Sequence, residues 1–407
     1  MSEPSAPSGE SASGHPRTLP AAPSAPLGSS ALGVAVIGAG MIGAVHRRSA
    51  LLAGADVVGV LASTPQRSRE VAAQWGVERA YDDLDAVLAD DRIQVVHICT
   101  PNATHARYAE AALRAGRHVV CEKPLGIGVE QARQLAELAE ARGLVATVPF
   151  VYRYHPLVRE LRARRLAGEF GEWYLLHGSY LQDWMLSPDA SGWRVDPELG
   201  GPSRAFADIG SHWCDLVEWV SGERFTEVMA HTSVAVPTRP ATDTPSFSGP
   251  AAPAAARVPV QTEDSAALLL RTGGGLLGST VVSQVSAGRK NRLWFELDGA
   301  RGSAVFDQEN PETAWLGAAD GQRILVRDPE HGSAEQRRLS LLPAGHAQGY
   351  AQCFEAFVAD TYAAVRGDLI PERRDGLPTF ADGLRSAHLV DAVLRSSRDN
   401  AWMKVEA

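Results

Sequence analysis

Residues 33–43 read GVAVIGAGMIG, a short apolar run that leads into three glycines spaced as G-x-G-x-x-G. The apolar run is typical of a buried strand, and the next residues, 44–50, have a helical pattern. A strand, a glycine-rich turn and a helix in this order begin a βαβ dinucleotide-binding unit. We expect Gly38 to permit the tight turn, Gly40 to let the pyrophosphate approach the backbone, and Gly43 to let the helix lie close to the strand. Met41 and Ile42 would stand in the first helical turn, where backbone N–H groups bind an anion.

Outward from this motif, apolar runs and helical stretches alternate up to about residue 150. Strands are predicted at 34–38, 57–61, 94–99, 118–121 and 144–148, and helices near 42–53, 66–75, 104–115 and 128–142. Alternating βα units predict a doubly wound parallel sheet that is covered on both faces. Residues 33–150 are therefore expected to form an N-terminal α/β domain of the Rossmann type.

The pattern changes after residue 150, where the strands become longer and alternate. Strands are predicted at 173–182, 266–271, 276–285 and 293–297, and helices near 153–167, 205–220, 347–366 and 380–396. Residues 151–407 are expected to form a second α/β domain with a large, mostly antiparallel open sheet and C-terminal helices within 347–396. Residues 237–259, rich in Pro, Ala, Ser and Thr, are predicted to be a surface loop.

The composition is that of an ordinary globular protein. The chain has 407 residues, of which 45% are hydrophobic and 21% charged, enough for two cores. The formal net charge of −9 argues against nucleic acid or an anionic membrane as a partner, and no apolar run reaches the ~18 residues of a membrane span. Residues 1–32 are predicted to be a disordered tail. The four widely spaced cysteines are expected to be free thiols of a cytoplasmic protein.

Two further motifs follow predicted strands of the first domain. Thr100-Pro101-Asn102, with His105 close behind, follows the third strand, and CEKP, residues 121–124, follows the fourth. Both lie at carboxyl ends of parallel strands, where open α/β sheets hold their ligands. Together with the glycine motif they resemble the Gfo/Idh/MocA family, the glucose–fructose oxidoreductase and inositol dehydrogenase group. The resemblance runs from about residue 33 to the C-terminus.

The resemblance implies a nucleotide domain and an α/β domain that supports a homodimer or homotetramer, with the substrate in the cleft between them. It also implies that Lys123 meets Asp208 and His212 at the reacting carbon. Because residues i and i+4 share a helix face, the Asp208 carboxylate is expected to orient the His212 imidazole. A metal site at this pair is the alternative. Zinc usually needs a cysteine and histidine cluster that the sequence lacks, so no metal is expected.

Other segments resemble the branch of this family that contains levoglucosan dehydrogenase and related enzymes that oxidise a pyranoside at carbon 3. These segments are GSYLQDW (178–184), WRVDP (193–197) and SQVSAGRKN (283–291). Within that branch Tyr152 and Gln182 would join Lys123 and His212 around the sugar. Amides, charged groups and aromatic faces bind sugars, so the predicted substrate site also includes Trp184, Trp193 and Arg194. Core packing is the alternative for the two tryptophans.

The cofactor site is expected to extend beyond the glycine motif. The resemblance adds Thr100, Pro101, Asn102, His105, Glu122 and Lys123. The second strand ends at Leu61, and the residues after it, among them Ser63, Thr64 and Arg67, include no acid for the ribose diol of NAD. Hydroxyls and a cation can bind a 2′-phosphate, so the sequence slightly favours NADP over NAD. A solvated helix charge is the alternative role for Arg67.

These residues predict an NAD(P)-dependent oxidoreductase that interconverts a secondary alcohol and a ketone on a sugar, anhydrosugar or glycoside. His212 would take the hydroxyl proton as hydride leaves, and Lys123 would stabilise charge on the oxygen; the two roles could be exchanged. Two alternatives stay open. The substrate could be an inositol or a nucleotide-linked sugar, or the chain could be a non-catalytic dinucleotide-binding regulator.

Overall fold

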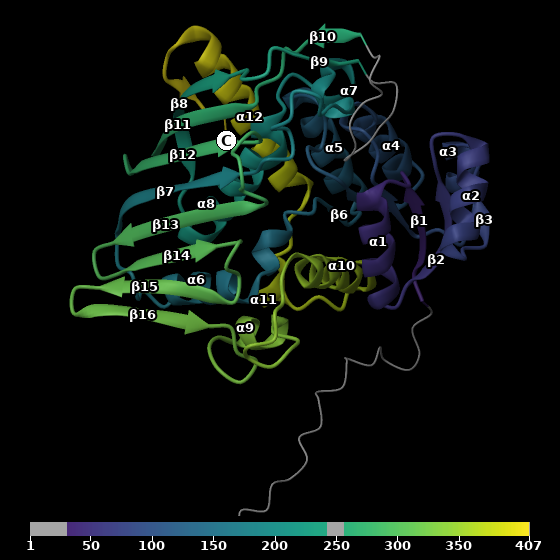
Figure 1. Cartoon of the computed structure of the whole chain (residues 1–407). Coiled ribbons are helices and arrows are strands. Elements are labelled where there is room, and N and C mark those ends of the chain that lie inside the picture. The colour runs from purple at the N-terminus through teal and green to yellow at the C-terminus, as the bar shows by residue number, and fades with distance from the viewer. Residues whose placement is uncertain (1–30, 242–255, 407) are drawn as a thin grey trace, which may run out of the picture. The chain divides into compact units, whose positions relative to one another are not determined.

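The computed structural model describes residues 31–241 and 256–406. Six parallel strands form the predicted first sheet, in the order β3-β2-β1-β4-β5-β6 (Figure 1). Their bounds are Gly33–Ile37 (β1), Asp56–Leu61 (β2), Arg79–Ala80 (β3), Val95–Ile98 (β4), His118–Cys121 (β5) and Ala146–Thr147 (β6). Residues 1–30 of the predicted tail lie outside the described residues. Leu32, predicted to belong to that tail, is buried in the core beside β1.

The strand order places a switch point at β1, from which the chain builds the sheet first toward β3 and then toward β6. The helices of this part are α1 (Met41–Leu52), α2 (Pro65–Trp75), α3 (Leu84–Leu88), α4 (Asn102–Arg114) and α5 (Val129–Arg142). Strand β3 and helix α3 were not predicted, because elements this short carry no periodic signal. A ligand is expected in the crevice outside the carboxyl ends of β1 and β4, where the strand order reverses.

The second sheet has nine strands in the order β16-β15-β14-β13-β7-β12-β11-β8-β17. All neighbours are antiparallel except β12 and β7, which are parallel. The bounds are Trp173–Leu181 (β7), Phe225–Ser233 (β8), Ser265–Thr272 (β11), Leu277–Ser283 (β12), Arg292–Gly299 (β13), Ser303–Asp307 (β14), Thr313–Ala318 (β15), Gly321–Val326 (β16) and Met403–Lys404 (β17). The predicted large, mostly antiparallel sheet is confirmed.

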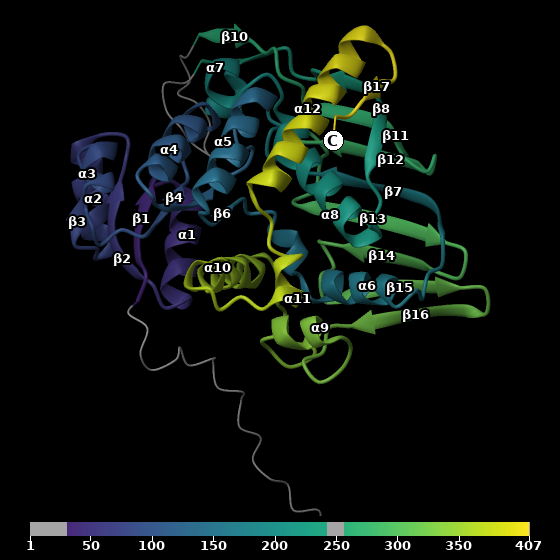
Figure 2. The same ribbon diagram turned by 180° about the vertical axis from the view of Figure 1, so that it is seen from behind.

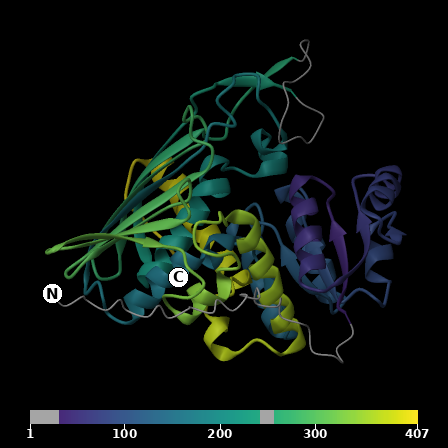
Figure 3. The ribbon, with the colours of Figure 1, turned by 60° about the horizontal axis from the view of Figure 1, so that its bottom comes forward.

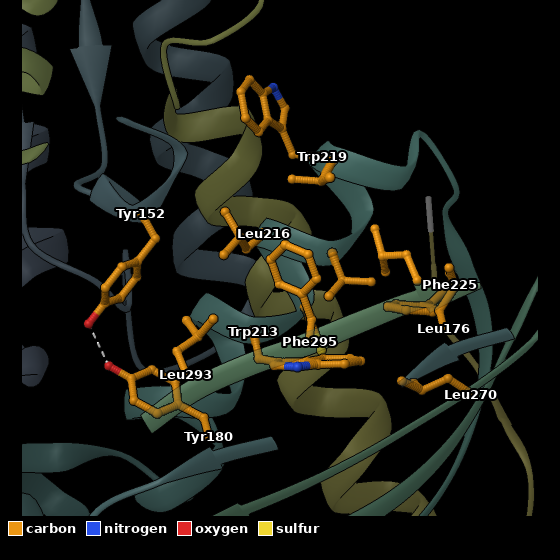
Figure 4. Close-up of a cluster of buried hydrophobic side chains, with 14 of the residues drawn as sticks. Tyr152, Leu176, Tyr180, Trp213, Leu216, Trp219, Phe225, Leu270, Leu293 and Phe295 are labelled. Atoms are coloured by element: carbon orange, nitrogen blue, oxygen red, sulfur yellow. Dashed lines mark hydrogen bonds between the residues drawn. The ribbon is translucent and has the colours of Figure 1, made fainter. Parts of the chain in front are cut away.

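Helices cover one face of this sheet, as Figures 2 and 3 show. They are α6 (Pro156–Leu166), α8 (Ser211–Ser221) and α12 (Phe380–Asp399). Alternate strand residues, such as Leu176, Leu270 and Phe295, are buried against these helices around Trp213 (Figure 4). The residues between them face the other side, which no helix of the described residues covers. The short helices are η1 (Val151–Tyr154), η2 (Trp193–Val195), α7 (Pro197–Gly200), η3 (Phe206–Gly210), α9 (Ala334–Leu339) and α11 (Pro371–Arg374).

The C-terminal helices contact the nucleotide-binding part as well as the second sheet. Helix α10 (Tyr350–Arg366) packs on α1, and its Phe354, Phe357 and Tyr362 share a core with Val34 and Val36 of β1. Helix α12 packs on both α5 and β8. The end of the chain therefore joins the two sheets, which its position in the sequence does not indicate.

The predicted loop 237–259 contains regular structure. Strands β9 (Thr238–Pro240) and β10 (Arg257–Pro259) pair as an antiparallel ribbon, and residues 242–255 lie outside the described residues. The prediction was wrong for the two ends of the segment, since three-residue strands around a proline-rich stretch give no alternating pattern. Among the described helices, none is long and apolar enough to cross a membrane.

Candidate active site

The glycine motif makes the predicted turn between β1 and α1. Gly38 has a φ of +101°, in the left-handed region that favours glycine. A Cβ on Gly43 would lie 2.1 Å from the carbonyl oxygen of Gly38, so helix and strand can pack this closely only at a glycine. A Cβ on Gly40 would meet nothing within 4 Å, and no side chain caps the start of α1, where Met41 and Ile42 lie. This open helix N-terminus fits the pyrophosphate of a dinucleotide.

The residues after β2 form the exposed start of α2. Thr64 Oγ1 accepts a hydrogen bond from the backbone N–H of Arg67 at 3.1 Å and so caps the helix. The Arg67 guanidinium donates to Glu70 at 3.1 Å, and Ser63 is exposed. An exposed pair of this kind contributes little to stability, so the Arg67 side chain can exchange Glu70 for another anion.

The loop after β4 is fixed by side chains that the prediction assigned to the cofactor. Thr100 and Pro101 lead into α4, and Asn102 Nδ2 donates to the Gly200 carbonyl at 2.8 Å. The buried ring of His105 has Nδ1 2.8 Å from the Pro124 carbonyl oxygen and Nε2 2.8 Å from that of Thr100. His105 therefore holds the loops after β4 and β5 together, and neither ring nitrogen is left for a cofactor.

Lys123 follows β5 and reaches across to the second domain. Its Nζ donates to the Asp208 carboxylate at 2.6 Å and to the Asp208 carbonyl oxygen at 2.9 Å. Burial favours the neutral acid, but the charges of Lys123 and Arg194 hold the pKa of Asp208 well below its usual range. Lys123 and Asp208 therefore form a partly buried ion pair that joins the two domains.

Asp208 does not orient His212, contrary to the prediction. No hydrogen bond joins the two side chains among the described residues, and His212 Nδ1 is buried without a partner. Asp208 lies in η3, a π-helical turn whose hydrogen bonds run from residue i to i+5. The rule that residues i and i+4 share a face holds for an α-helix and fails across this turn.

The His212 ring is held by aromatic contacts. It stands edge to face with Phe150, with ring centroids 5.5 Å apart, and with Tyr152, at 5.4 Å. Burial, together with the nearby charge of Lys123, lowers the pKa of His212 to about 3. The imidazole is therefore neutral at physiological pH, with an unpartnered nitrogen.

Gln284 is a residue of this site that the prediction missed. Its side chain is fully buried, and Nε2 donates to the second Asp208 oxygen, Oδ2, at 2.8 Å. Its amide oxygen has no partner. The residue lies in the segment 283–291, which resembles the levoglucosan dehydrogenase branch, but a glutamine at the end of a strand gives no signal of its own.

Glu122, predicted to bind the cofactor, is buried and has protein partners for both of its carboxylate oxygens. Its Oε2 accepts from the Lys123 backbone N–H at 3.2 Å, and its Oε1 is 3.0 Å from His46 Nε2. His46 Nδ1 in turn lies 2.9 Å from His97 Nδ1, and His97 Nε2 lies 2.9 Å from the Tyr362 hydroxyl. One arrangement satisfies every contact: Tyr362 donates to His97, His97 to His46, and His46 to an ionised Glu122.

Tyr152 belongs to a closed ring of hydrogen bonds with two residues that the prediction did not include. Asn291 Nδ2 donates to the Tyr152 oxygen at 2.9 Å, and Tyr180 donates to Asn291 Oδ1 at 2.7 Å. The Tyr152 hydroxyl completes the ring by donating to Tyr180 at 2.7 Å (Figure 4). Burial raises the pKa of Tyr152 to about 12, so its proton stays in place.

The remaining predicted substrate residues extend from this ring. Gln182 donates to Asn291 at 2.9 Å and accepts from Trp184 Nε1 at 3.0 Å. Arg194 lies 3.6 Å from Asp208 Oδ1, and its guanidinium stacks over the Trp193 ring, 4.3 Å from the centroid. The loop 182–195 therefore connects to the hydrogen-bond ring of Tyr152, Tyr180 and Asn291 and also to the Lys123–Asp208 pair.

The group of possible metal ligands found among the described residues lies elsewhere. His177 faces Glu296 and Asp298 across β7 and β13, on the side of the second sheet that no described helix covers. Asp208 and His212 are not part of such a group.

Two family models match the chain. The model described as an oxidoreductase family with an NAD-binding Rossmann fold matches residues 32–150, and the GFO/IDH/MocA C-terminal domain matches residues 158–305. The chain belongs to the Gfo/Idh/MocA family. It is accordingly an oxidoreductase with an NAD-binding domain, and the predicted family and fold class are confirmed.

Relatives within the Gfo/Idh/MocA family act on several polyols. Levoglucosan dehydrogenase of Pseudarthrobacter phenanthrenivorans is 31% identical over 84% of this chain and 88% of its own length. Inositol 2-dehydrogenase of Rhizobium meliloti is 26% identical over 91% of this chain and 98% of its own. A levoglucosan dehydrogenase structure with NADH and L-sorbose superposes with a TM-score of 0.83 at 28% identity, covering 92% of this chain and 99% of that one.

Proposed function

We propose that the chain is an NAD(P)-dependent dehydrogenase that interconverts a secondary hydroxyl and a ketone at carbon 3 of a pyranose sugar, anhydrosugar or glycoside. The observation that carries the proposal is the partly buried Lys123–Asp208 pair, with the neutral His212 four residues after Asp208 and an open helix N-terminus at Gly40. Lys123 and Gly40 follow strands of one parallel sheet at its carboxyl edge. A bound nicotinamide would supply the hydride acceptor.

Lys123 is proposed to stabilise the negative charge that develops on the substrate oxygen. Its ammonium group is held by both the carboxylate and the carbonyl oxygen of Asp208, which restricts where it can point. A donor that is already oriented costs little reorganisation during the reaction. Asp208 is therefore assigned the positioning of Lys123.

His212 is proposed to accept the hydroxyl proton. A lowered pKa makes the imidazole a weak base in the free enzyme, but the hydroxyl becomes far more acidic as hydride leaves its carbon. Burial keeps the imidazole neutral, and therefore able to accept a proton, until the substrate binds.

The substrate class is inferred from the polar and aromatic groups of the loop 182–195. Gln182, Trp184, Trp193 and Arg194 offer an amide, two aromatic faces and a guanidinium, which are the groups that recognise sugar hydroxyls and ring faces. The similarity to levoglucosan dehydrogenase supports an anhydrosugar as substrate. The similarity to D-glucoside 3-dehydrogenase of Escherichia coli, 34% identical over 48% of this chain and 55% of its own length, supports oxidation at carbon 3.

NADP is proposed as the preferred form of the cofactor. Residues 61–69 contain no carboxylate to repel a 2′-phosphate, and the exposed Arg67 can leave Glu70 to bind one. We also infer a cytoplasmic enzyme, because the four cysteines are buried free thiols, and a homodimer or homotetramer formed through the open side of the second sheet. No nucleic acid or membrane partner is proposed.

The test is reduced-nicotinamide absorbance with NAD or NADP and a panel of levoglucosan, glucose, simple glycosides and inositols. We expect turnover of a pyranose in the wild type, and a loss of at least about 100-fold in kcat for Lys123→Ala and for His212→Ala. An Arg67→Ala variant should lose kcat/KM for NADP and keep it for NAD. Turnover of inositols alone would contradict the sugar assignment, and cofactor binding without any turnover would favour a regulator.

The pH profile tests the role of His212. Because burial lowers its pKa to about 3, wild-type kcat/KM should show no inflection near the ordinary histidine value of about 6.5. An ascending limb near pH 6.5 that disappears in His212→Asn would contradict a neutral His212 in the free enzyme.

A further inference from the structure

We propose that the β9–β10 ribbon is a strap that positions the substrate loop 182–195, and that Arg239 of β9 is its positioning residue. The inference rests on the proposed function for its consequence on sugar binding, but its structural part can be tested without any substrate.

Arg239 is fully buried and donates to three backbone carbonyls of the loop. Its Nη1 lies 2.9 Å from the oxygens of Ser187 and Ala190, and its Nη2 lies 2.8 Å from that of Met185. A planar guanidinium with a fixed fork of donors sets the relative position of three carbonyls, which a lysine ammonium cannot do in the same way. The loop between Trp184 and Trp193 is therefore shaped around one side chain.

The other strand of the ribbon holds the same loop from its exposed side. Arg257 of β10 donates to the Pro188 carbonyl and to the Asp189 carboxylate, both at 2.9 Å. Ser191 Oγ returns a hydrogen bond to the Pro240 carbonyl at 2.8 Å. Met185 and Val195 of the loop also share a small apolar cluster with Val260, directly after the ribbon. Residues of both β9 and β10 thus form hydrogen bonds with the loop between Met185 and Ser191.

The strap is connected to the Lys123–Asp208 pair through Asp264. This fully buried carboxylate accepts from Arg239 at 3.0 Å and from Arg204, and both partners are also fully buried. Arg204 begins the segment that leads into η3, and the Asp208 backbone N–H donates to its carbonyl at 2.8 Å. The Asp264 carboxylate therefore binds both Arg239, which holds the substrate loop, and Arg204, which precedes η3.

Through these contacts Arg239 is expected to affect sugar binding by way of the loop. Among the described residues, no hydrogen bond joins it to the glycine motif of the cofactor site. When Arg239 is replaced, Asp264 keeps Arg204 as a partner, so the catalytic turn stays anchored while the loop loses three contacts. The loop carries Trp184, Trp193 and Arg194, which the proposed function assigns to the sugar. The expected consequence is a higher KM for the sugar, with a smaller change in kcat.

The test compares Arg239→Met and Arg239→Lys with the wild type by hydrogen exchange and by kinetics. In Arg239→Met we expect exchange within residues 183–196 to rise by about tenfold, and KM for the sugar to rise by about tenfold, equivalent to about 1.4 kcal/mol. Affinity for the dinucleotide should stay unchanged. Arg239→Lys should recover part of the loss, because it restores one charged donor beside Asp264.

Arg327→Met is the matched control, since Arg327 is also fully buried and holds the carbonyls of Leu342, Pro343 and His346, far along the chain. It should leave exchange at 183–196 and sugar KM unchanged. If Arg239→Met does not fold, Arg257→Ala on the exposed strand should still raise exchange at 183–196. Unchanged exchange in the folded variants, or an equal rise throughout the chain, would overturn the strap. If the wild type turns over no sugar, the proposed function fails and the exchange result still decides this inference.

Discussion

At the residue scale, the chemistry depends on how each polar atom near Lys123 is partnered. Asp208 uses one oxygen for Lys123 and the other for Gln284, while His212 Nδ1 and Gln284 Oε1 have no partner. Buried polar groups are nearly always hydrogen-bonded in native proteins. The two unpartnered atoms are buried beside the Lys123–Asp208 pair, so this region is less completely hydrogen-bonded than a protein core usually is.

The hydrogen bond from Gln284 can be tested directly. Gln284→Leu removes a donor to a charged carboxylate, worth about 1.5–3 kcal/mol, so kcat should fall by about 10–100-fold. Gln308→Leu is the control, because its amide oxygen is also buried without a partner and, among the described residues, it makes no hydrogen bond to Asp208. Equal kcat values for the two variants would show that Gln284 does not hold Asp208 in its working position.

At the element scale, two glycines of the turn from β1 to α1 are expected to have different roles, because their surroundings differ. Gly43 allows close packing, and Gly40 leaves room for the cofactor. Gly43→Ala places a Cβ 2.1 Å from a backbone oxygen and should lower the free energy of unfolding by about 1–3 kcal/mol. Gly40→Ala enters open space, so stability should change by less than about 1 kcal/mol. Its affinity for NAD or NADP should fall by about tenfold. Thermal unfolding measures the stability of each variant, and cofactor titration measures its affinity. If Gly40→Ala keeps the wild-type affinity, the pyrophosphate does not bind beside Gly40.

At the scale of the whole molecule, the side of the nine-stranded sheet that no described helix covers carries several exposed apolar side chains. Leu269, Leu277 and Val281 lie on neighbouring strands and point to this side, and each is nearly half exposed. Leu269 and Val281, together with Met229 and Ala267, line an open depression of about 500 Å³ on this side. Large exposed apolar patches are found at protein interfaces more often than on surfaces that stay in contact with solvent.

The assembly is therefore expected to depend on this side of the sheet. Leu269→Glu with Val281→Glu should shift a dimer or tetramer to smaller species in light scattering after size exclusion, because two charges would be buried in the contact. Leu52→Glu, a similarly exposed leucine on α1, should leave the assembly intact. A monomeric wild type, or a double variant of unchanged mass, would contradict the interface.

The sequence by itself determined the family, the parallel sheet and the glycine turn, because these depend on local periodicity and on residue types with narrow conformational roles. The motifs around Gly38, Lys123 and His212 could be recognised in the sequence for the same reason. Only the tertiary structure decided that Asp208 pairs with Lys123, 85 positions away, and not with His212. The same holds for the contacts of Gln284, Tyr180 and Asn291 beside this pair and Tyr152. The tertiary structure also decided that Arg239 reaches back to the loop at 185–190. Such contacts depend on a π-helical turn, on strand register and on buried charge pairing, which only the packed chain defines.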